Sequence, residues 1–545
     1  MPEQIKKIVR KYPYHAVFLS AVIAWLPAVF IPFINDDYQI LGYHAGKGWI
    51  SILRPFYTPD VSNFYWRPLG NVLHPLILLT AGFHPMVFRV ASLLLYALCC
   101  LFVAKAGEKA GLSKTYSALG AILFAVLPSH EYQAAWIADQ GESLVTIMLL
   151  AAFCTYADVL GKESSGRRNV ILFYVLLLLS ALIKESAFAG VLIPVIALIA
   201  GRDLKKRKTV TALRDTLAGI VIIACILLYR WYFIGGTPFS SNHFAHSGIF
   251  RWVQNFIIYI PLSFFSPESL ELLASTSRVL LALASAGVLI AFYIIFIYRK
   301  PLRTDRHLIW TLIASLAWFT VFILPGLPTL MRWYVFTASI GLVWAAAAAG
   351  ENIKAGSFSK KASLVLFLLV ILSSSVYDFS LMLRWGSVGK RMDHALMSLS
   401  GVKDEIKTDT VYVWATPDKL TRIPMMKLGI QESVQWGLKD KNAAVITPLR
   451  SEMSGFESSI KLVEKTDTSL VFHINNGRFL PYGGESRAAI HNEAIDAESE
   501  GVRIRIKTFL GEDNVPQSIA GVYFRNSRGY SQLYFDGKEF KNAGK

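Results

Sequence analysis

The chain has 545 residues, of which 54% are hydrophobic and 13% aromatic, and its net charge is +17. Repeated apolar runs exclude an ordinary soluble enzyme and indicate a protein that crosses a membrane several times. The charge does not indicate a nucleic-acid ligand, because residues 401–545 are near neutral, with 20 basic and 19 acidic residues. The excess lies in short loops between apolar runs, as expected of loops on the cytoplasmic side.

The first apolar run, Phe18 to Ile34, follows a basic N-terminal stretch and ends at Asn35-Asp36-Asp37-Tyr38. It is long enough to cross a bilayer, and no small-residue cleavage site follows it, so we expect an uncleaved span. The two adjacent carboxylates should emerge at a membrane face, where they suit a general base or a metal ligand. The plainer interpretation is that they end the helix at the interface.

Further apolar runs predict ten more spans, with residues 38–85 outside the membrane. A proline-interrupted run at 251–266 is expected to be an external interfacial or re-entrant segment. This arrangement puts every Lys/Arg-rich loop on one side, with the N-terminus cytoplasmic in the inner membrane and the C-terminus extracytoplasmic. The ten spans are expected near residues 86–104, 115–128, 141–158, 169–183, 186–200, 215–234, 277–298, 307–324, 331–349 and 362–379.

Residues 400–545 have a different character, with several stretches rich in β-forming residues. Strands are expected around 410–415, 469–474 and 502–507, with a turn at Asn475-Asn476-Gly477 and one amphipathic helix from Ile423 to Leu438. Gly521–Phe524 and Gln532–Lys538 predict a hairpin followed by a second turn. The expected fold class is an α-helical polytopic membrane protein of about 11 spans with a C-terminal β-rich (α+β) extracytoplasmic domain.

The expected domains are a transmembrane domain, 1–399, whose external loop 35–85 carries the two aspartates, and a soluble β-rich domain, 400–545. Polar groups collect on the external face of this arrangement. They are Asp36, Asp37, Arg67, His130, Glu131, Asp139, Glu142, Lys184, Glu185 and Arg332. Ionisable groups at a membrane are costly and indicate function by default.

Each group also has a structural interpretation. Arg67 and Arg332 can be snorkelling anchors, Lys184-Glu185 an ion pair at a tight turn, and His130-Glu131 an interfacial cap. His130-Glu131 lacks a second histidine four residues on, so a zinc-protease helix is not supported. Taken together, the cations suit a phosphate and a carboxylate suits deprotonation of an acceptor hydroxyl or amine.

A series of motifs gives these groups a family context. Asp36-Asp37, Tyr65-Trp-Arg-Pro-Leu, the stretch from Leu123 to Leu144, Leu182-Ile-Lys-Glu-Ser and Leu324 to Tyr334 follow one another in a familiar order. Over about residues 15–350 the chain resembles the GT-C superfamily of polyprenyl-phosphate-sugar glycosyltransferases. The nearest branch resembles the dolichyl-phosphate-mannose protein mannosyltransferases that carry tetratricopeptide repeats, and their bacterial relatives.

The resemblance implies an inverting glycosyltransferase, with a polyprenyl-phosphate-linked sugar as donor and short helices of the first external loop lying along the membrane. It implies that Asp36 is the catalytic base with Asp37 as its partner. The other implied roles are carrier-phosphate binding by Arg67, Lys184 and Arg332, and a sugar pocket made by His130, Glu131, Glu142 and Glu185. Some relatives use a divalent metal ion, and one aspartate pair does not decide whether this chain does.

The chain departs from the family in two places. Arg89 and Ser92 stand where the family has a histidine and an asparagine, and the β-rich tail replaces the tetratricopeptide repeats. The acceptor, whether protein, lipid or glycan, therefore cannot be carried over. Two alternatives stay open: a transporter or flippase for a lipid-linked or anionic substrate, although no paired repeats are visible, and an envelope protein whose spans only anchor the tail.

Overall fold

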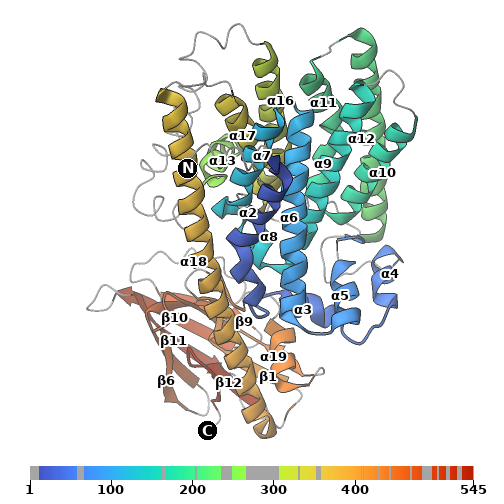
Figure 1. Ribbon diagram of the computed structural model, residues 1–545. Helices are drawn as coiled ribbons and strands as arrows, with labels where there is room; N and C mark the ends of the chain where they lie inside the picture. Colours follow the sequence, from blue (N-terminus) through green and yellow to red (C-terminus); the bar gives the residue numbers. More distant parts are fainter. Residues whose placement is uncertain are drawn as a thin grey trace. The chain divides into compact units, whose positions relative to one another are not determined.

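The computed structural model describes most of the chain as two compact units (Figure 1). The helical unit comprises Met1–Val29, Lys47–Ala81 and Val87–Met382, and the mixed unit comprises Phe30–Gly46, Gly82–Met86 and Leu383–Lys545. The described residues are 11–57, 67–70, 72–161, 167–202, 205–234, 248–265, 306–328, 330, 332–351, 358–406, 408, 410–420, 423–426, 430–440, 443–466, 469–481, 494–499, 502–510, 516–524 and 531–543.

Long apolar helices dominate the helical unit, as the apolar runs predict. Within it α9 packs against α10 and α11, α16 against α17, and α7 against α2 and α17. The helices are α2 (Pro13–Trp25), α4 (Ile50–Tyr57), α5 (Leu73–Ala81), α6 (Pro85–Lys109), α7 (Lys114–Ala125), α8 (Glu131–Ala135), α9 (Gln140–Gly161), α10 (Arg167–Ile183), α11 (Ile193–Gly201), α12 (Lys206–Ile234), α13 (Ile249–Leu262), α16 (Arg306–Ile323), α17 (Val335–Glu351) and α18 (Phe358–Val402). Short 3₁₀ turns join them, among them η1 (Leu26–Phe30), η2 (Pro128–His130), η3 (Ile137–Asp139), η4 (Glu185–Leu192), η6 (Leu324–Gly326) and η7 (Arg332–Tyr334).

Six helical segments of the described chain are long and apolar enough to cross a membrane. They are Pro13–Phe30, Pro85–Lys109, Ile137–Gly161, Lys206–Tyr232, His307–Gly326 and Phe367–Glu405. Shorter helices occupy four more predicted spans, and the predicted span at 277–298 lies outside the described residues. The expectation of several membrane spans is therefore confirmed, whereas a total of eleven stays a prediction.

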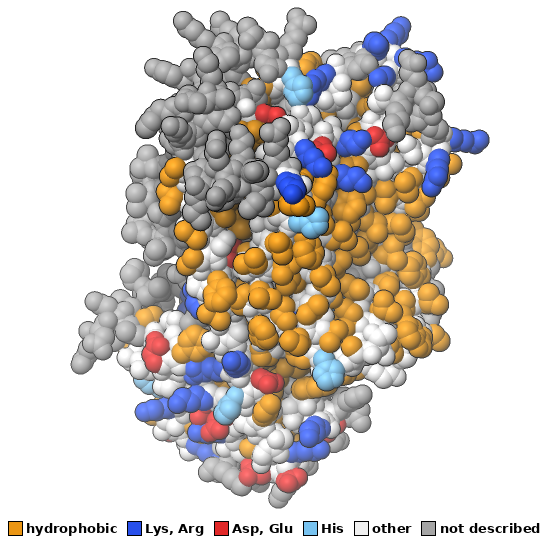
Figure 2. Space-filling model, in the orientation of Figure 1, with side chains coloured by type: hydrophobic (Ala, Val, Ile, Leu, Met, Phe, Trp, Pro, Cys, Tyr) orange, Lys and Arg blue, Asp and Glu red, His pale blue; other side chains and the backbone are white. Residues whose placement is uncertain are grey.

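Loops that the charge pattern assigned to one side of the membrane meet at one end of the helical unit. Tyr14 donates a hydrogen bond to Glu108 across 2.8 Å, and Gly111 lies against the side chains of Arg202 and His307. Figure 2 shows Lys and Arg side chains gathered at this end of the helical unit and apolar side chains covering its middle. These described segments thus lie at one end of the helical unit, as the predicted alternation requires. The side of the membrane that this end faces stays a prediction.

Three sheets form most of the mixed unit. One has the order β13-β12-β1-β4, and β1 runs parallel to both of its neighbours. The second, in the order β6-β7-β11-β10-β9, is antiparallel, and the third has the order β3-β2-β5-β8. The strands are β1 (Thr410–Trp414), β2 (Thr416–Leu420), β3 (Ile423–Pro424), β4 (Ala444–Ile446), β5 (Leu449–Met453), β6 (Ser459–Lys465), β7 (Ser469–Asn475), β8 (Gly477–Pro481), β9 (Ala494–Ser499), β10 (Val502–Leu510), β11 (Pro516–Phe524), β12 (Ser531–Phe535) and β13 (Phe540–Asn542).

The predicted strands and the Asn475-Asn476-Gly477 turn are confirmed, and Asn476 takes the positive φ of 58° that such a turn favours. The predicted hairpin of β11 with β12 is wrong. These strands belong to different sheets, because β12 inserts between β1 and β13 while β11 inserts between β7 and β10. The predicted helix from Ile423 to Leu438 is confirmed only in its second part, as α19 (Ile430–Leu438), and is wrong at its start, where Ile423–Pro424 form strand β3.

A segment from near the N-terminus belongs to the mixed unit. The short helix α3 (Asp37–His44) packs against α19, and the amide of Asn35 donates to the carbonyl of Met425 across 2.8 Å. Gly42 permits the close approach, because a Cβ there would lie 3.2 Å from Cγ of Glu432. The division into compact units does not test where the transmembrane domain ends. The predicted domain boundary at residue 399 therefore stays a prediction.

Candidate functional site

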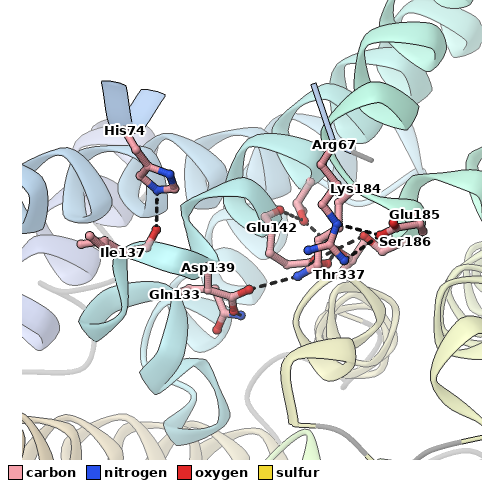
Figure 3. A network of polar contacts seen from close by, with 11 residues as sticks. Arg67, His74, Gln133, Ile137, Asp139, Glu142, Lys184, Glu185, Ser186 and Thr337 are labelled. Carbon is pink, nitrogen blue, oxygen red and sulfur yellow. Dashed lines mark hydrogen bonds and ion pairs between the residues drawn. The ribbon is translucent and has the colours of Figure 1, made fainter. Parts of the chain in front are cut away.

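A buried lysine is the centre of a polar network in the helical unit (Figure 3). Nζ of Lys184 lies 3.1 Å from Asp139 and 2.8 Å from Glu142, and the three side chains are only 10%, 5% and 1% exposed. Thr337 and Ser186 donate to the two oxygens of Glu142 across 3.0 and 3.2 Å. Both oxygens of the Glu142 carboxylate therefore have hydrogen-bond or ion-pair partners within the protein.

Backbone geometry explains this convergence. Lys184 is the extended residue between α10 and η4, with φ of −159° and ψ of 149°, in the turn between two predicted spans. Asp139 ends η3, and Glu142 lies in the first turn of α9, where the helix dipole favours a negative charge. Burial lowers the pKa of Lys184, but the carboxylates of Asp139 and Glu142 outweigh it and hold that pKa above its ordinary value.

Two arginines share a carboxylate beside this lysine. Glu185 accepts from Arg67 through one oxygen, across 2.7 and 2.8 Å, and from Arg230 of α12 through the other, across 2.7 Å. The side chain of Arg230 is 2% exposed, whereas those of Arg67 and Glu185 are 29% and 21% exposed. Arg67 is therefore the solvent-facing cation of this trio.

The segment that carries Arg67 is held against the end of α10. The amide of Leu69 donates to the carbonyl of Leu182 across 3.1 Å, and a Cβ on Gly70 would lie 2.6 Å from the carbonyl oxygen of Ile183. Only a glycine allows this approach, which brings the Arg-Pro-Leu element to the Lys184-Glu185 dipeptide. The two motifs, far apart in the chain, meet as their predicted placement on one face requires.

Arg89 and Ser92, at which the chain departs from the family that it resembles, make contacts that hold this end of the helical unit together. The guanidinium of Arg89 donates to the carbonyl of Ala135 across 2.5 Å, and the amide of Gln140 donates to Ser92 across 2.7 Å. Nε2 of His74 lies 2.9 Å from the carbonyl of Ile137. These contacts fix α8 and η3, so they position Asp139 rather than add a charged group to the network.

Asp36 and Asp37 lie in the mixed unit at the start of α3, and their surroundings differ. Asp37 is 0% exposed and accepts from the amide of Ile34 across 3.0 Å, which closes the turn before the helix. Asp36 is 9% exposed, occupies the N-cap position of α3 without a side-chain capping bond, and accepts from the side-chain amide of Asn35 across 3.1 Å. Asn35 has a positive φ of 53°, a conformation that asparagine tolerates. Asp36 is thus the less buried aspartate of the pair.

Two residues of the predicted sugar pocket lie elsewhere in the helical unit. His130 is 0% exposed, lies between Phe124 and Phe336, and its ring nitrogens contact Tyr96 and Ser339 at 3.0 and 3.1 Å. These are the surroundings of a core histidine. Glu131, 5% exposed, begins α8. Their place in a sugar pocket stays a prediction.

The network thus contains Arg67, Glu142, Lys184 and Glu185 of the predicted site. The side chain of Arg332 lies outside what the structure describes, and its backbone begins η7. Sequence reasoning missed Arg230, although an arginine inside the apolar run 215–234 is itself a signal of function. It also missed Thr337, which lies in none of the motifs named above.

Charge balance limits what this network can do. Among the described residues it sets three cations, Arg67, Lys184 and Arg230, against three carboxylates, Asp139, Glu142 and Glu185. An arriving anion meets Arg67 at the exposed edge and meets Lys184 only by displacing a carboxylate. No three His, Cys, Asp or Glu side chains within the described part of the chain come together as metal ligands.

Comparison with known proteins adds a resemblance in structure. No family model and no curated protein sequence matches the chain. The chain is similar to the crystal structure of ArnT from Cupriavidus metallidurans bound to undecaprenyl phosphate, at 12% identity and a TM-score of 0.43, over 83% of this chain and 95% of that chain. Likeness at this level assigns no activity. The helices and sheets themselves establish the class, a helical multi-span membrane protein with a C-terminal β-rich region.

Proposed function

We propose that the chain is a membrane glycosyltransferase that moves a sugar from a polyprenyl-phosphate carrier to an acceptor. The proposal places the reaction on the extracytoplasmic face of the cytoplasmic membrane, with the N-terminus in the cytoplasm and the mixed unit outside. The observation that carries it is the pair Arg67 and Arg230 on one carboxylate, with Arg67 open to solvent at the end of a bundle of apolar helices. A guanidinium there suits the phosphate of a carrier whose lipid lies among the helices.

The proposed step is a single displacement. The acceptor oxygen forms a bond to the anomeric carbon while the bond from that carbon to the phosphate oxygen breaks, which inverts the configuration. The electron pair leaves on the carrier phosphate, whose charge Arg67 stabilises, with Arg332 as a further candidate. Asp36 takes the acceptor proton, because it is the more accessible carboxylate of its pair.

Lys184 takes a different role in this proposal from the one its motif implies. Its two carboxylate partners are buried with it, so it serves to position Asp139, Glu142 and the Glu185 that follows it. Glu142 and Glu185 remain the candidates for hydroxyl contacts of the donor sugar. A divalent metal ion is not required by the step as written.

The test uses the purified full chain in detergent with a panel of radiolabelled undecaprenyl-phosphate sugars. We expect consumption of at least one donor, a loss of about a hundredfold or more in Arg67→Gln, and no loss in Arg207→Gln. Arg207 is a suitable control because it is an exposed arginine of α12. Movement of a donor across sealed vesicles with no consumption would instead support the transporter alternative and end this proposal.

A further inference from the structure

An aromatic cluster in the mixed unit has no part in the step described above. Tyr38 of α3, Phe83 in the segment before α6 and Trp436 of α19 come together from distant parts of the chain. The ring centroid of Trp436 lies 4.5 Å from that of Phe83 and 6.3 Å from that of Tyr38. Tyr38 is 6% exposed, whereas Trp436 keeps 46% of its surface exposed. The cluster thus has a buried base and an open indole.

The helix that carries the indole is held in place on two sides. A Cβ on Gly437 would lie 2.6 Å from Cδ1 of Leu399 and 2.7 Å from the carbonyl oxygen of Leu396, so α19 lies directly against α18. On its other side α19 packs against α3, where a Cβ on Gly42 would lie 3.2 Å from Cγ of Glu432 (Figure 1). A tryptophan fixed in this way loses little conformational freedom when a ligand stacks on it.

The described residues near Trp436 in the sequence of α19 are polar where they are exposed. Glu432 precedes Trp436 by four residues and therefore shares its face of α19. Tyr38, at the base of the cluster, directly follows Asp36 and Asp37. The exposed residues at the two ends of α19 are also polar; they are Gln431, Lys439 and Asp440.

We propose that Trp436 is the platform on which a pyranose ring of the acceptor stacks, so that the acceptor is a carbohydrate. This inference rests on the proposed function, because it places the acceptor beside Asp36. A pyranose has a face of C–H bonds that packs on an aromatic ring and a rim of hydroxyls that hydrogen-bond to carboxylates. An open indole with Glu432 one turn before it on α19 offers both kinds of contact.

The surroundings of Trp436 disfavour two other occupants. Aromatic anchors at a bilayer surface act beside a surplus of Lys and Arg. Glu432, Lys439 and Asp440 instead sum to a net charge of −1, which gives no attraction to anionic lipids. A protein partner is expected to cover a wider patch than one tryptophan whose exposed helical neighbours are polar. The pyranose is the occupant that uses the indole and the Glu432 carboxylate together.

Binding is tested without any donor, by saturation-transfer NMR on the full chain in detergent. The probes are the methyl glycosides of glucose, galactose, mannose and N-acetylglucosamine. We expect saturation of pyranose C–H protons by the native chain and by Trp436→Phe, and its loss in Trp436→Ala. The matched control is Trp231→Ala, which removes a tryptophan of α12 that is 58% exposed and should leave the signal unchanged.

Two results would overturn the platform: no signal with the native chain, or equal signals in Trp436→Ala and the native chain. In the transfer reaction, Trp436→Ala should raise the acceptor KM about tenfold with a smaller effect on kcat. Sugar binding without donor consumption would retain the platform and end the proposed function. Donor consumption without Trp436-dependent sugar binding would retain the proposed function and end the platform.

Discussion

Replacing Lys184 with methionine separates a positioning role from direct phosphate binding. The substitution keeps the length of the side chain and removes the charge that neutralises Asp139 and Glu142. Both carboxylates are at most 5% exposed, so neither gains water in compensation. Breaking a buried pair in this way costs about 3–5 kcal/mol, because an uncompensated charge remains in the fold.

The assay is reversible unfolding of the full chain in mixed micelles of increasing SDS content, followed by helical circular dichroism. We expect Lys184→Met to lower the free energy of unfolding by about 3–5 kcal/mol. Neutralising the partners as well, with Asp139→Asn and Glu142→Gln, should recover most of that loss. The recovery is the sign of an electrostatic cause, since three substitutions would otherwise destabilise more than one.

Lys109→Met is the matched control. Lys109 pairs with Asp158 across 2.6 Å, but the two side chains are 38% and 34% exposed, so losing this pair should cost less than about 1 kcal/mol. Equal stability of Lys184→Met and the native chain would refute the reasoning. A rise in the donor KM of Lys184→Met with no change in stability would instead indicate that Lys184 binds the carrier phosphate.

Three further predictions concern other contacts. Glu185→Gln deprives Arg230, a guanidinium 2% exposed, of its carboxylate and should lower stability in the same assay by on the order of 3 kcal/mol; an unchanged midpoint would contradict the shared-carboxylate geometry. Gly437→Ala should destabilise the mixed unit in a thermal melt by about 1–3 kcal/mol through overpacking against α18, whereas Gly386→Ala, with open space around it, should not. Burial raises the pKa of Asp536, but a lysine and two backbone amides outweigh it and hold that pKa below 3.8, so this carboxylate stabilises the fold above pH 3.8 and ceases to as the pH falls. The difference in melting temperature between the native chain and Asp536→Asn should therefore be largest near pH 7 and vanish in acid, and a constant difference would disprove the linkage.

Hydropathy located most helices within a few residues but misjudged the end of one. The predicted span at 362–379 is part of α18, which continues to Val402. Its later turns bury Trp385, Val388 and Leu399 while exposing polar residues, so the helix becomes amphipathic where its mean hydropathy falls. A window that averages hydropathy ends at that change, although the helix does not.

The candidate site was predictable as far as its residue types and order allowed. Ionisable residues at the ends of apolar runs identified Arg67, Lys184 and Glu185, because such groups must find partners in a membrane protein. Their pairing was not predictable, since it depends on Gly70 bringing one loop against the end of α10. For the same reason no sequence pattern predicted the contact between α3 and α19. These helices are nearly 400 residues apart in the chain, and they pack together at Gly42.

The most direct test of the central claim compares Asp36→Asn and Asp37→Asn in transfer of sugar from the carrier to an acceptor by the full chain. The account predicts that Asp36→Asn loses transfer by at least about a hundredfold with an unchanged unfolding midpoint. It predicts that Asp37→Asn lowers the midpoint, because the Asp37 carboxylate closes the turn before α3. Full transfer activity in both variants would contradict the account.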